Sequence, residues 1–178
     1  RSGRVTGVQT CALPISTLAL FFSLPLFAGA EWWSGSSSST YYEEGPEWKE
    51  SEVKLPPYPK SGDLLEFQVD NPASKHHYFI DAASISVAED YVIRYSVVIK
   101  TSSGASNLFY DGIRCQTREY KNYAFGVNGE FIKNESTIWG MVRGYDFFRK
   151  ALLRGIVCSN ANQPRSAQEV VDHIKYGR

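Results

Sequence analysis

Apolar side chains that recur at every second position impose the strongest constraint on the fold of this chain. From Tyr91 to Ile99, a tyrosine, isoleucine or valine occupies each odd-numbered position. A repeat of two residues is typical of a β-strand with one buried face. We therefore expect a long, half-buried strand over residues 91–100.

Shorter stretches of strand-forming residues lie on both sides of it. We expect further strands at residues 65–69, 78–80, 85–87, 107–110, 113–120, 123–125 and 131–132. The pair Asn128-Gly129 separates the last two and is a strong signal for a tight hairpin turn. Within residues 113–120, Cys115 falls on the predicted inner face.

The spacing of apolar residues changes toward the C-terminus. Residues 145–154 place apolar side chains at helical intervals, with Arg149 on the opposite face. Ser166 and Glu169 have the spacing of a capping box, which predicts the start of a final helix. Strands followed by helices predict an α+β domain over residues 60–178. Its expected form is an antiparallel, meander-like sheet of about six strands, packed with one or two C-terminal helices.

The first thirty residues are expected to be absent from the mature protein. Residues 5–15 resemble a translated sequencing-adapter oligonucleotide, which makes residues 1–15 an expected artefact. Residues 16–30 resemble a truncated signal peptide, because an apolar run ends in the small residues Ala28-Gly29-Ala30. This pattern predicts export, cleavage after Ala30 and a periplasmic location.

Residues 31–59 are expected to form a flexible, aromatic and Pro-rich segment in front of the domain. Residues 34–40 contain only Ser, Gly and Thr, so they have no apolar side chain to bury. The prolines of residues 54–59 favour an extended backbone. The aromatic side chains of the segment either dock on the domain or form an arm that contacts a ligand.

Charge and hydropathy exclude two kinds of partner. The 19 basic and 19 acidic residues give a net charge of zero, and without Arg1 and Arg4 the balance is slightly acidic. Nucleic-acid binding requires a clustered basic face, so we expect no nucleic-acid partner. The apolar run from Leu18 is too short to span a bilayer and contains Pro25, so we expect no transmembrane segment in the mature chain.

The cysteines form an even pair once Cys11, in the adapter-like segment, is set aside. An exported chain favours a disulfide between Cys115 and Cys158. The alternative is two buried free thiols. A metal site is not expected, because two distant cysteines lack the paired spacing of zinc ligands.

No residue pattern predicts catalysis, a cofactor or a metal. His76 and His77 are adjacent on a predicted strand, where neighbours face opposite sides and cannot readily share a metal. Four carboxylates fall near predicted strand ends, where a hydrolytic pair could form. These are Asp81, Glu89, Asp90 and Asp111. Turn capping and protection of sheet edges explain such residues equally well.

Arg94, Arg114 and Glu119 form a candidate binding face. Arg94 lies in the middle of the long strand, and Arg114 flanks the inward-facing Cys115 on the outer face. If the strands are neighbours, the three side chains form a polar patch for an anion or a partner protein. The alternative is an ordinary cross-strand ion pair.

The types and order of many residues together match the pattern of one protein family. They are Leu55-Pro56, Pro59, Phe67, Phe79-Ile80-Asp81, Ser84-Ile85-Ser86-Val87, Asp90, Val92-Ile93-Arg94-Tyr95, Gly104-Ala105, Asn107, Tyr110, Gly112-Ile113-Arg114-Cys115, Glu119, Lys121, Tyr123-Ala124, Gly126, Trp139 and Cys158. This set resembles the cryptic neisserial protein-like family of small exported proteins. The resemblance implies an envelope location and a single compact domain, but no activity.

These observations favour a non-enzymatic protein of the cell envelope that binds another envelope protein or cell-surface material. The alternative is a hydrolase that uses the strand-end carboxylates.

Overall fold

The computed structural model of the chain describes residues 47–177. The expected adapter segment, the signal peptide and residues 31–46 lie outside the described residues.

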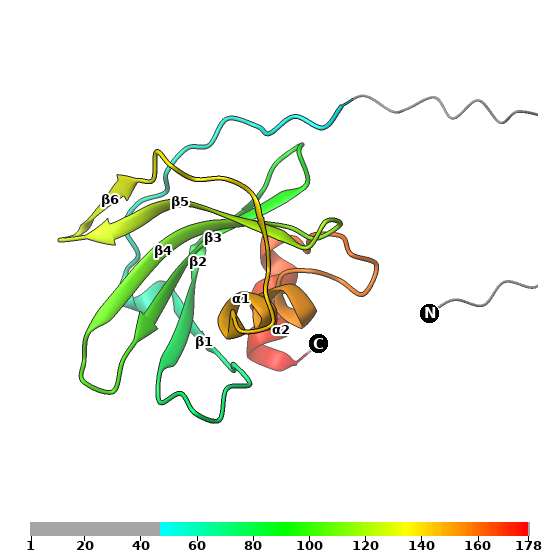
Figure 1. Cartoon of the computed structure of the whole chain (residues 1–178). Coiled ribbons are helices and arrows are strands. Elements are labelled where there is room, and N and C mark those ends of the chain that lie inside the picture. The colour runs from blue at the N-terminus through cyan, green and yellow to red at the C-terminus, as the bar shows by residue number, and fades with distance from the viewer. Residues whose placement is uncertain (1–46, 178) are drawn as a thin grey trace, which may run out of the picture. The chain divides into compact units, whose positions relative to one another are not determined.

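An antiparallel sheet forms the body of the molecule (Figure 1). Six strands follow one another in chain order: β1 (Leu64–Phe67), β2 (His77–Val87), β3 (Val92–Lys100), β4 (Ser106–Arg114), β5 (Glu119–Val127) and β6 (Glu130–Lys133). A short seventh strand, β7 (Gly140–Met141), pairs with the beginning of β5. A 3-10 turn, η1 (Ser61–Asp63), precedes β1.

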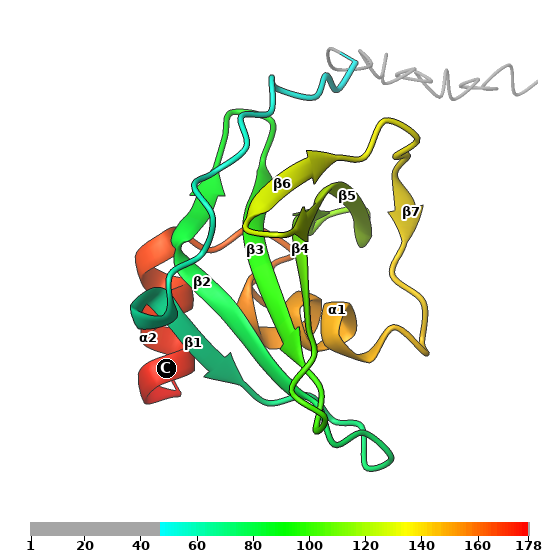
Figure 2. The same ribbon diagram turned by 90° about the vertical axis from the view of Figure 1, so that its left-hand side faces the viewer.

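Helical segments follow the strands and lie against one face of the sheet (Figure 2). They are α1 (Phe147–Ala151), its π-helical continuation η2 (Leu152–Ile156), and α2 (Ala167–Tyr176). The predicted α+β architecture is confirmed, including the order of strands first and helices last.

The capping box at the start of α2 is formed as predicted. The Ser166 hydroxyl accepts a hydrogen bond from the Glu169 N–H at 3.3 Å, and the Glu169 carboxylate accepts one from the Ser166 N–H at 2.7 Å. At the other end, Gly177 adopts a left-handed conformation, which suits a residue without a Cβ.

Two regions of the sheet differ from the sequence expectation. Residues 78–80 and 85–87 belong to a single strand, β2, whose pairing with β3 shifts register between Asp81 and Ser86. Residues 115–118 form the turn between β4 and β5, and Arg118 takes a left-handed conformation there. The alternation from Ile113 to Thr117 therefore ends in a hairpin turn instead of a continuous strand.

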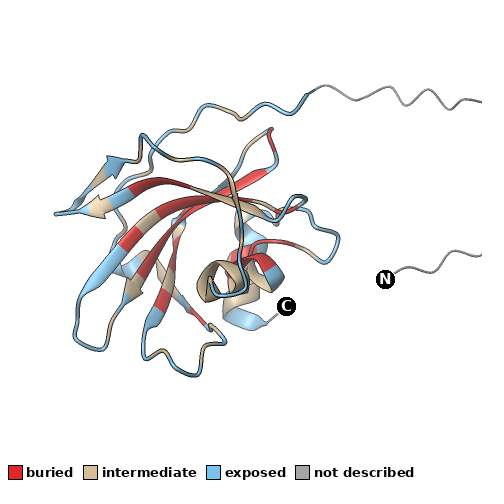
Figure 3. Ribbon diagram, viewed as in Figure 1, coloured by how far each residue is buried: buried red, intermediate tan, exposed pale blue. Residues whose placement is uncertain are grey.

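The two faces of the sheet are covered by different parts of the chain. Facing the helices is an apolar core that includes Ile93, Tyr95 and Val97 of β3, with Leu152 and Val170 opposite them. Figure 3 shows the buried residues concentrated on the central strands. We call this side the helix face.

The other side is crossed by residues 48–59, which we call the strap. The strap adopts no helix or strand and runs along the sheet before entering η1 (Figure 2). Its Val53 packs on Tyr110, Tyr123 and Ala124 of β4 and β5. We call this side the strap face.

A disulfide joins Cys115 and Cys158, with 5.7 Å between the two Cα atoms. It ties the turn after β4 to the chain that follows η2, and both residues are buried. Cys158 lies in an isolated bridge with Pro164, outside the sheet. The predicted pairing itself is present in the structure.

Candidate functional site

Arg94, Arg114 and Glu119 lie on the strap face. Cross-strand partners point to the same side of a sheet, and Arg94 pairs with Gly112 whereas Arg114 pairs with Glu119. Alternation along β4 puts Gly112 and Arg114 on one side, so all three side chains share it. The structure thus brings them to one face, and the strap covers that face.

Arg94 and Arg114 have different partners. Arg114 Nη1 donates to Glu119 Oε2 at 3.1 Å, which is the cross-strand pair considered above. Arg94 is only 4% exposed and binds Asp90 with both Nη1 and Nη2. Arg94 therefore forms a buried ion pair with Asp90 and is inaccessible to a ligand while the strap is docked.

Asp90 connects the strap to the sheet. Its carboxylate accepts hydrogen bonds from Arg94, from the Val92 N–H and from the strap's Ser51 N–H, the last at 2.8 Å. Its carbonyl oxygen accepts the indole N–H of Trp48 at 2.9 Å. Burial opposes ionisation, but the hydrogen bonds led by Arg94 outweigh it and lower the pKa of Asp90. The side chain stays a carboxylate that holds two positions of the strap.

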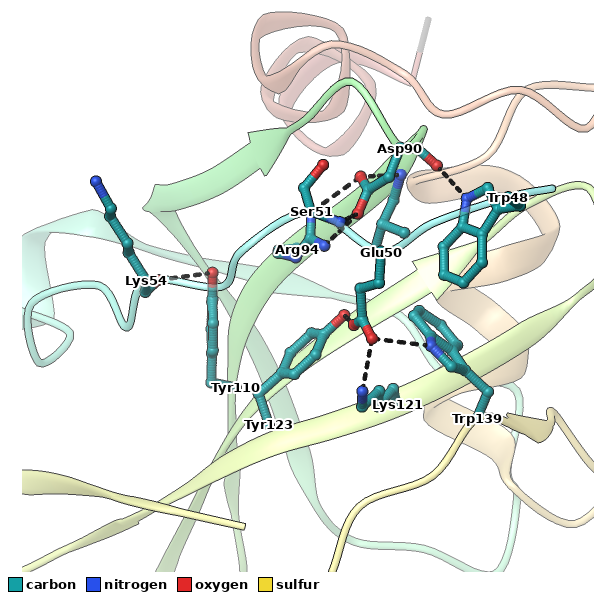
Figure 4. A network of polar contacts seen from close by, with 11 residues as sticks. Trp48, Glu50, Ser51, Lys54, Asp90, Arg94, Tyr110, Lys121, Tyr123 and Trp139 are labelled. Carbon is teal, nitrogen blue, oxygen red and sulfur yellow. Dashed lines mark hydrogen bonds and ion pairs between the residues drawn. The ribbon is translucent and has the colours of Figure 1, made fainter. Parts of the chain in front are cut away.

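Glu50 is the second anchor of the strap (Figure 4). Glu50 Oε2 accepts from Lys121 Nζ at 2.7 Å and from Trp139 Nε1 at 3.4 Å, whereas Oε1 accepts from Tyr123 Oη at 2.7 Å. Burial opposes the negative charge, but these donors outweigh it and lower the pKa of Glu50. Burial, followed by the bond to Glu50, raises the pKa of Tyr123, so its hydroxyl remains a donor.

Aromatic rings and cations surround the same anchor. The Arg114 guanidinium lies over the Trp48 ring at 3.7 Å from its centroid. The Trp139 ring meets Trp48 edge to face, with 5.8 Å between centroids. Lys121 lies 5.5 Å from the Tyr123 ring centroid. The same guanidinium lies 5.7 Å from the Trp139 ring centroid, so one planar cation contacts both indoles, an arrangement that favours attraction between cation and ring.

A pocket of about 460 Å³ opens beside the anchors, between the strap and the β5–β6 end of the sheet. The strap contributes Glu50, Ser51, Glu52, Val53 and Leu55, and the domain contributes Lys121, Tyr123, Lys133, Asn134 and Thr137. Its lining combines both signs of charge with amide, hydroxyl and apolar groups. Such a lining can bind a ligand through hydrogen bonds and a small apolar contact.

The four candidate carboxylates do not come together. Asp90 lies on the strap face, whereas Asp111 pairs with Tyr95 and lies on the helix face. Asp81 and Ser84 line a small pocket together with the prolines of the strap, and burial raises the pKa of Asp81. Glu89 is exposed in the turn before β3. Asp90 and Asp111 lie on opposite faces of the sheet, so they cannot act as the pair that a hydrolase would need.

Asp111 has a structural partner that the sequence did not predict. Arg149 Nε donates to Asp111 Oδ2 at 2.8 Å, and Asn122 Nδ2 donates to Oδ1 at 2.8 Å. Arg149 Nη1 also binds Asp146 at 2.8 Å. Burial is the largest influence on Asp111 and raises its pKa despite these donors. The expectation that Arg149 faces away from the domain is wrong, because its side chain is 11% exposed.

The histidine pair lies at an exposed loop-to-strand junction. His77 begins β2, and its Nδ1 lies 2.8 Å from Glu66 Oε1 on β1.

In residues 47–177, no three His, Cys, Asp or Glu side chains are grouped as a metal would require. Within the same range, none of the helices combines the length and apolar content that crossing a bilayer requires.

Sequence reasoning missed most of the site. Glu119, Lys121 and Tyr123 alternate along β5, so the face they share could have been found from their spacing. Glu50 carries no such signal, because the strap has no repeat that predicts where a side chain points. Trp139 also lies outside any predicted element.

Comparison with known proteins agrees with the resemblance seen in the sequence. The chain is 27% identical to Cryptic neisserial protein 1 of Neisseria gonorrhoeae over 186 aligned residues, covering 88% of this chain and 91% of that protein. No solved structure matches the present chain. The family model described as the CNP1-like family matches residues 43–175, which hold the whole sheet, the disulfide and the strap. The chain belongs to the CNP1-like family.

Proposed function

We propose that this protein is a non-enzymatic binding module of the bacterial cell envelope that works in the periplasm. The observation that carries the proposal is the strap face with its adjoining pocket. Charged and aromatic groups there hold an extended stretch of polypeptide, and the pocket beside it is open and lined with mixed chemistry. This arrangement suits recognition of another envelope component.

The ionisation of the acidic groups supports binding over hydrolysis. Glu50 and Asp90 are the two carboxylates that anchor the strap, and the pKa of each is lowered by the donors around it. A general acid needs a raised pKa, so that it holds a proton near neutral pH. Carboxylates that are kept ionised by one cation and several neutral donors are better suited to fixing a bound segment than to transferring protons.

The disulfide and the N-terminal sequence support the location. Structural disulfides persist in oxidising compartments such as the periplasm, and Cys115 and Cys158 are joined. The apolar run before Ala28-Gly29-Ala30 has the form of an export signal. Expression with a completed signal, followed by fractionation and N-terminal sequencing, tests this point. We expect a periplasmic product that begins at or next to Glu31, and a purely cytoplasmic product would contradict it.

Affinity capture from native periplasm tests the binding role. The full exported protein should retain a discrete envelope component, and Lys133→Glu should reduce its recovery by about tenfold or more, because Lys133 lines the pocket. The matched control is Lys175→Glu, the same charge change at an exposed position of α2. Recovery that is equal for both variants would contradict a binding site at the pocket.

A further inference from the structure

We propose that the strap face is a recognition site for an extended peptide of a partner protein, in which a carboxylate follows a tryptophan by two positions. The chain's own Trp48 and Glu50 occupy that site in this structure. The inference rests on the proposed binding role and names the class of partner and its two recognised side chains.

The first half of the site is a carboxylate pocket. Three donors from two separate parts of the fold converge on Glu50: Lys121 and Tyr123 from β5, and Trp139 from the segment before β7 (Figure 4). When Glu50 leaves, an ammonium, a phenol and an indole N–H face the same position. Donors of this kind form their strongest hydrogen bonds with an ionised acceptor, so the pocket selects a carboxylate.

The second half is an aromatic slot. The Arg114 guanidinium lies over the Trp48 ring, the Trp139 ring meets that ring edge to face, and the Asp90 carbonyl oxygen accepts the Trp48 indole N–H. A phenylalanine can fill the slot but leaves that acceptor without its donor. The slot therefore prefers tryptophan.

The charges of the face limit the ligand to one negative group. Arg94 is paired with Asp90 and Arg114 with Glu119, and all four residues belong to the domain itself. Of the cations described here, Lys121 is the one whose carboxylate partner comes from the strap. Replacement of the strap thus calls for a single carboxylate, which argues against a polyanion as the natural ligand.

The strap is attached in a way that permits replacement. Residues 48–54 are not part of the sheet ladder. Their backbone contacts with the sheet are isolated ones, the Ser51 N–H to Asp90 and the Lys54 carbonyl to the Tyr110 hydroxyl. Trp48 itself is 37% exposed. A partner peptide can take these contacts without breaking a strand pair.

The test uses the full exported chain with an emptied site, Trp48→Ala together with Glu50→Ala. The probe is a labelled peptide with the sequence of residues 48–53, Trp-Lys-Glu-Ser-Glu-Val, followed by fluorescence anisotropy. We expect saturable binding to the emptied variant and binding at least tenfold weaker to the unaltered chain, whose own strap competes. Replacing Glu by Gln at the third position of the peptide, or Trp by Ala at the first, should each weaken binding by about tenfold.

A second measurement covers the case in which the emptied variant does not fold. The unaltered chain is titrated with the peptide while the nuclear magnetic resonance signal of the Trp48 indole N–H is followed. Displacement moves this signal toward its position in a free peptide, and Lys121→Met should abolish the dependence on the peptide's carboxylate. No peptide binding in either experiment overturns the inference. If capture that depends on Lys133 persists in that case, the binding role stands and the peptide inference alone is wrong.

Discussion

The helix face and the strap face of the sheet are built from different interactions. The helix face buries a continuous apolar core, closes it with the Cys115–Cys158 disulfide and contains the ion pairs of Arg149 with Asp111 and Asp146. The strap face is covered by a segment without secondary structure, which two carboxylates and an aromatic slot hold in place.

This difference separates the part of the molecule that stabilises the fold from the part that can exchange partners. Apolar burial and a covalent link depend little on any single polar contact. A segment held by a few hydrogen bonds and ion pairs can be released by changing one of them, because each contributes about 1 kcal/mol or a little more. Perturbation of the helix face should therefore unfold the domain, whereas perturbation of the strap face should release the strap.

The largest effect is expected from loss of the disulfide. Replacing both Cys115 and Cys158 by Ala should lower the free energy of unfolding by about 4 kcal/mol, since the bond closes a loop of 43 residues. Chemical denaturation of the oxidised protein measures the change, and the reduced wild type is the control that should match the variant. Two free thiols in the native oxidised protein would show that the pairing is wrong.

Arg149→Met tests the ion pair of the helix face. It should cost about 3 kcal/mol, because the fully buried Asp111 carboxylate keeps only Asn122 as a side-chain donor. The pKa of Asp111 is already raised, and the loss of Arg149 raises it further. The unfavourable charge exists above that pKa and disappears as the pH falls through it, so the deficit should shrink on acidification.

The control for this experiment is the double variant Asp111→Asn with Arg149→Met. It carries no buried charge at this position and should be more stable than Arg149→Met alone. A single variant as stable as wild type at neutral pH would show that the pair does not support the helix face.

Gly112→Ala tests how closely the strap face is packed. A Cβ at this position would lie 2.8 Å from Tyr123 Cε2 and 2.9 Å from both Tyr123 Oη and Val92 Cγ1. We expect a loss of about 2 kcal/mol, typical of an overpacked position, together with displacement of the Tyr123 hydroxyl from Glu50. Thermal melts measure the loss. Gly62→Ala, where the added Cβ meets nothing within 4 Å, is the matched control.

Glu50→Gln should have the smallest effect, about 1 kcal/mol at neutral pH, because it removes the charge from three partly exposed hydrogen bonds. The pKa of Glu50 is lowered in the folded chain. Its stabilising contribution is therefore complete above the ordinary glutamate pKa of about 4.3 and is lost as the pH falls through the lowered value. Denaturation curves of wild type and variant should converge in acid, and a constant difference would contradict the role of this charge.

The sequence predicted the sheet better than it predicted what covers the sheet. Alternation in β3 correctly placed Tyr95 inward, because side chains on a strand alternate strictly. Arg94 and Arg114 were expected on one face only if their strands were neighbours, and the pairing of β3 with β4 meets that condition. The hairpin turn at Asn128-Gly129 was also predicted correctly, and it joins β5 to β6. The turn after β4 was missed because Ile113, Cys115 and Thr117 continue the pattern of a strand through it.

Long-range polar contacts escaped prediction for a physical reason. Arg149 was expected on a solvent-exposed face because it is charged, yet it satisfies Asp111, which lies 38 positions earlier in the chain. Glu50 and Lys121 are 71 positions apart. Local spacing carries no information about such pairs, since they form only when the fold brings two separate elements together.

The three prolines of the strap, Pro56, Pro57 and Pro59, have a consequence for competition. They join the anchored residues to η1 through a short, stiffened link. A ligand tethered in this way acts at an effective concentration on the order of millimolar. A free peptide at about 1 μM, with the same contacts, would occupy only about one site in a thousand. A natural partner must therefore add contacts that the strap does not make, which sets an affinity threshold within the chain itself.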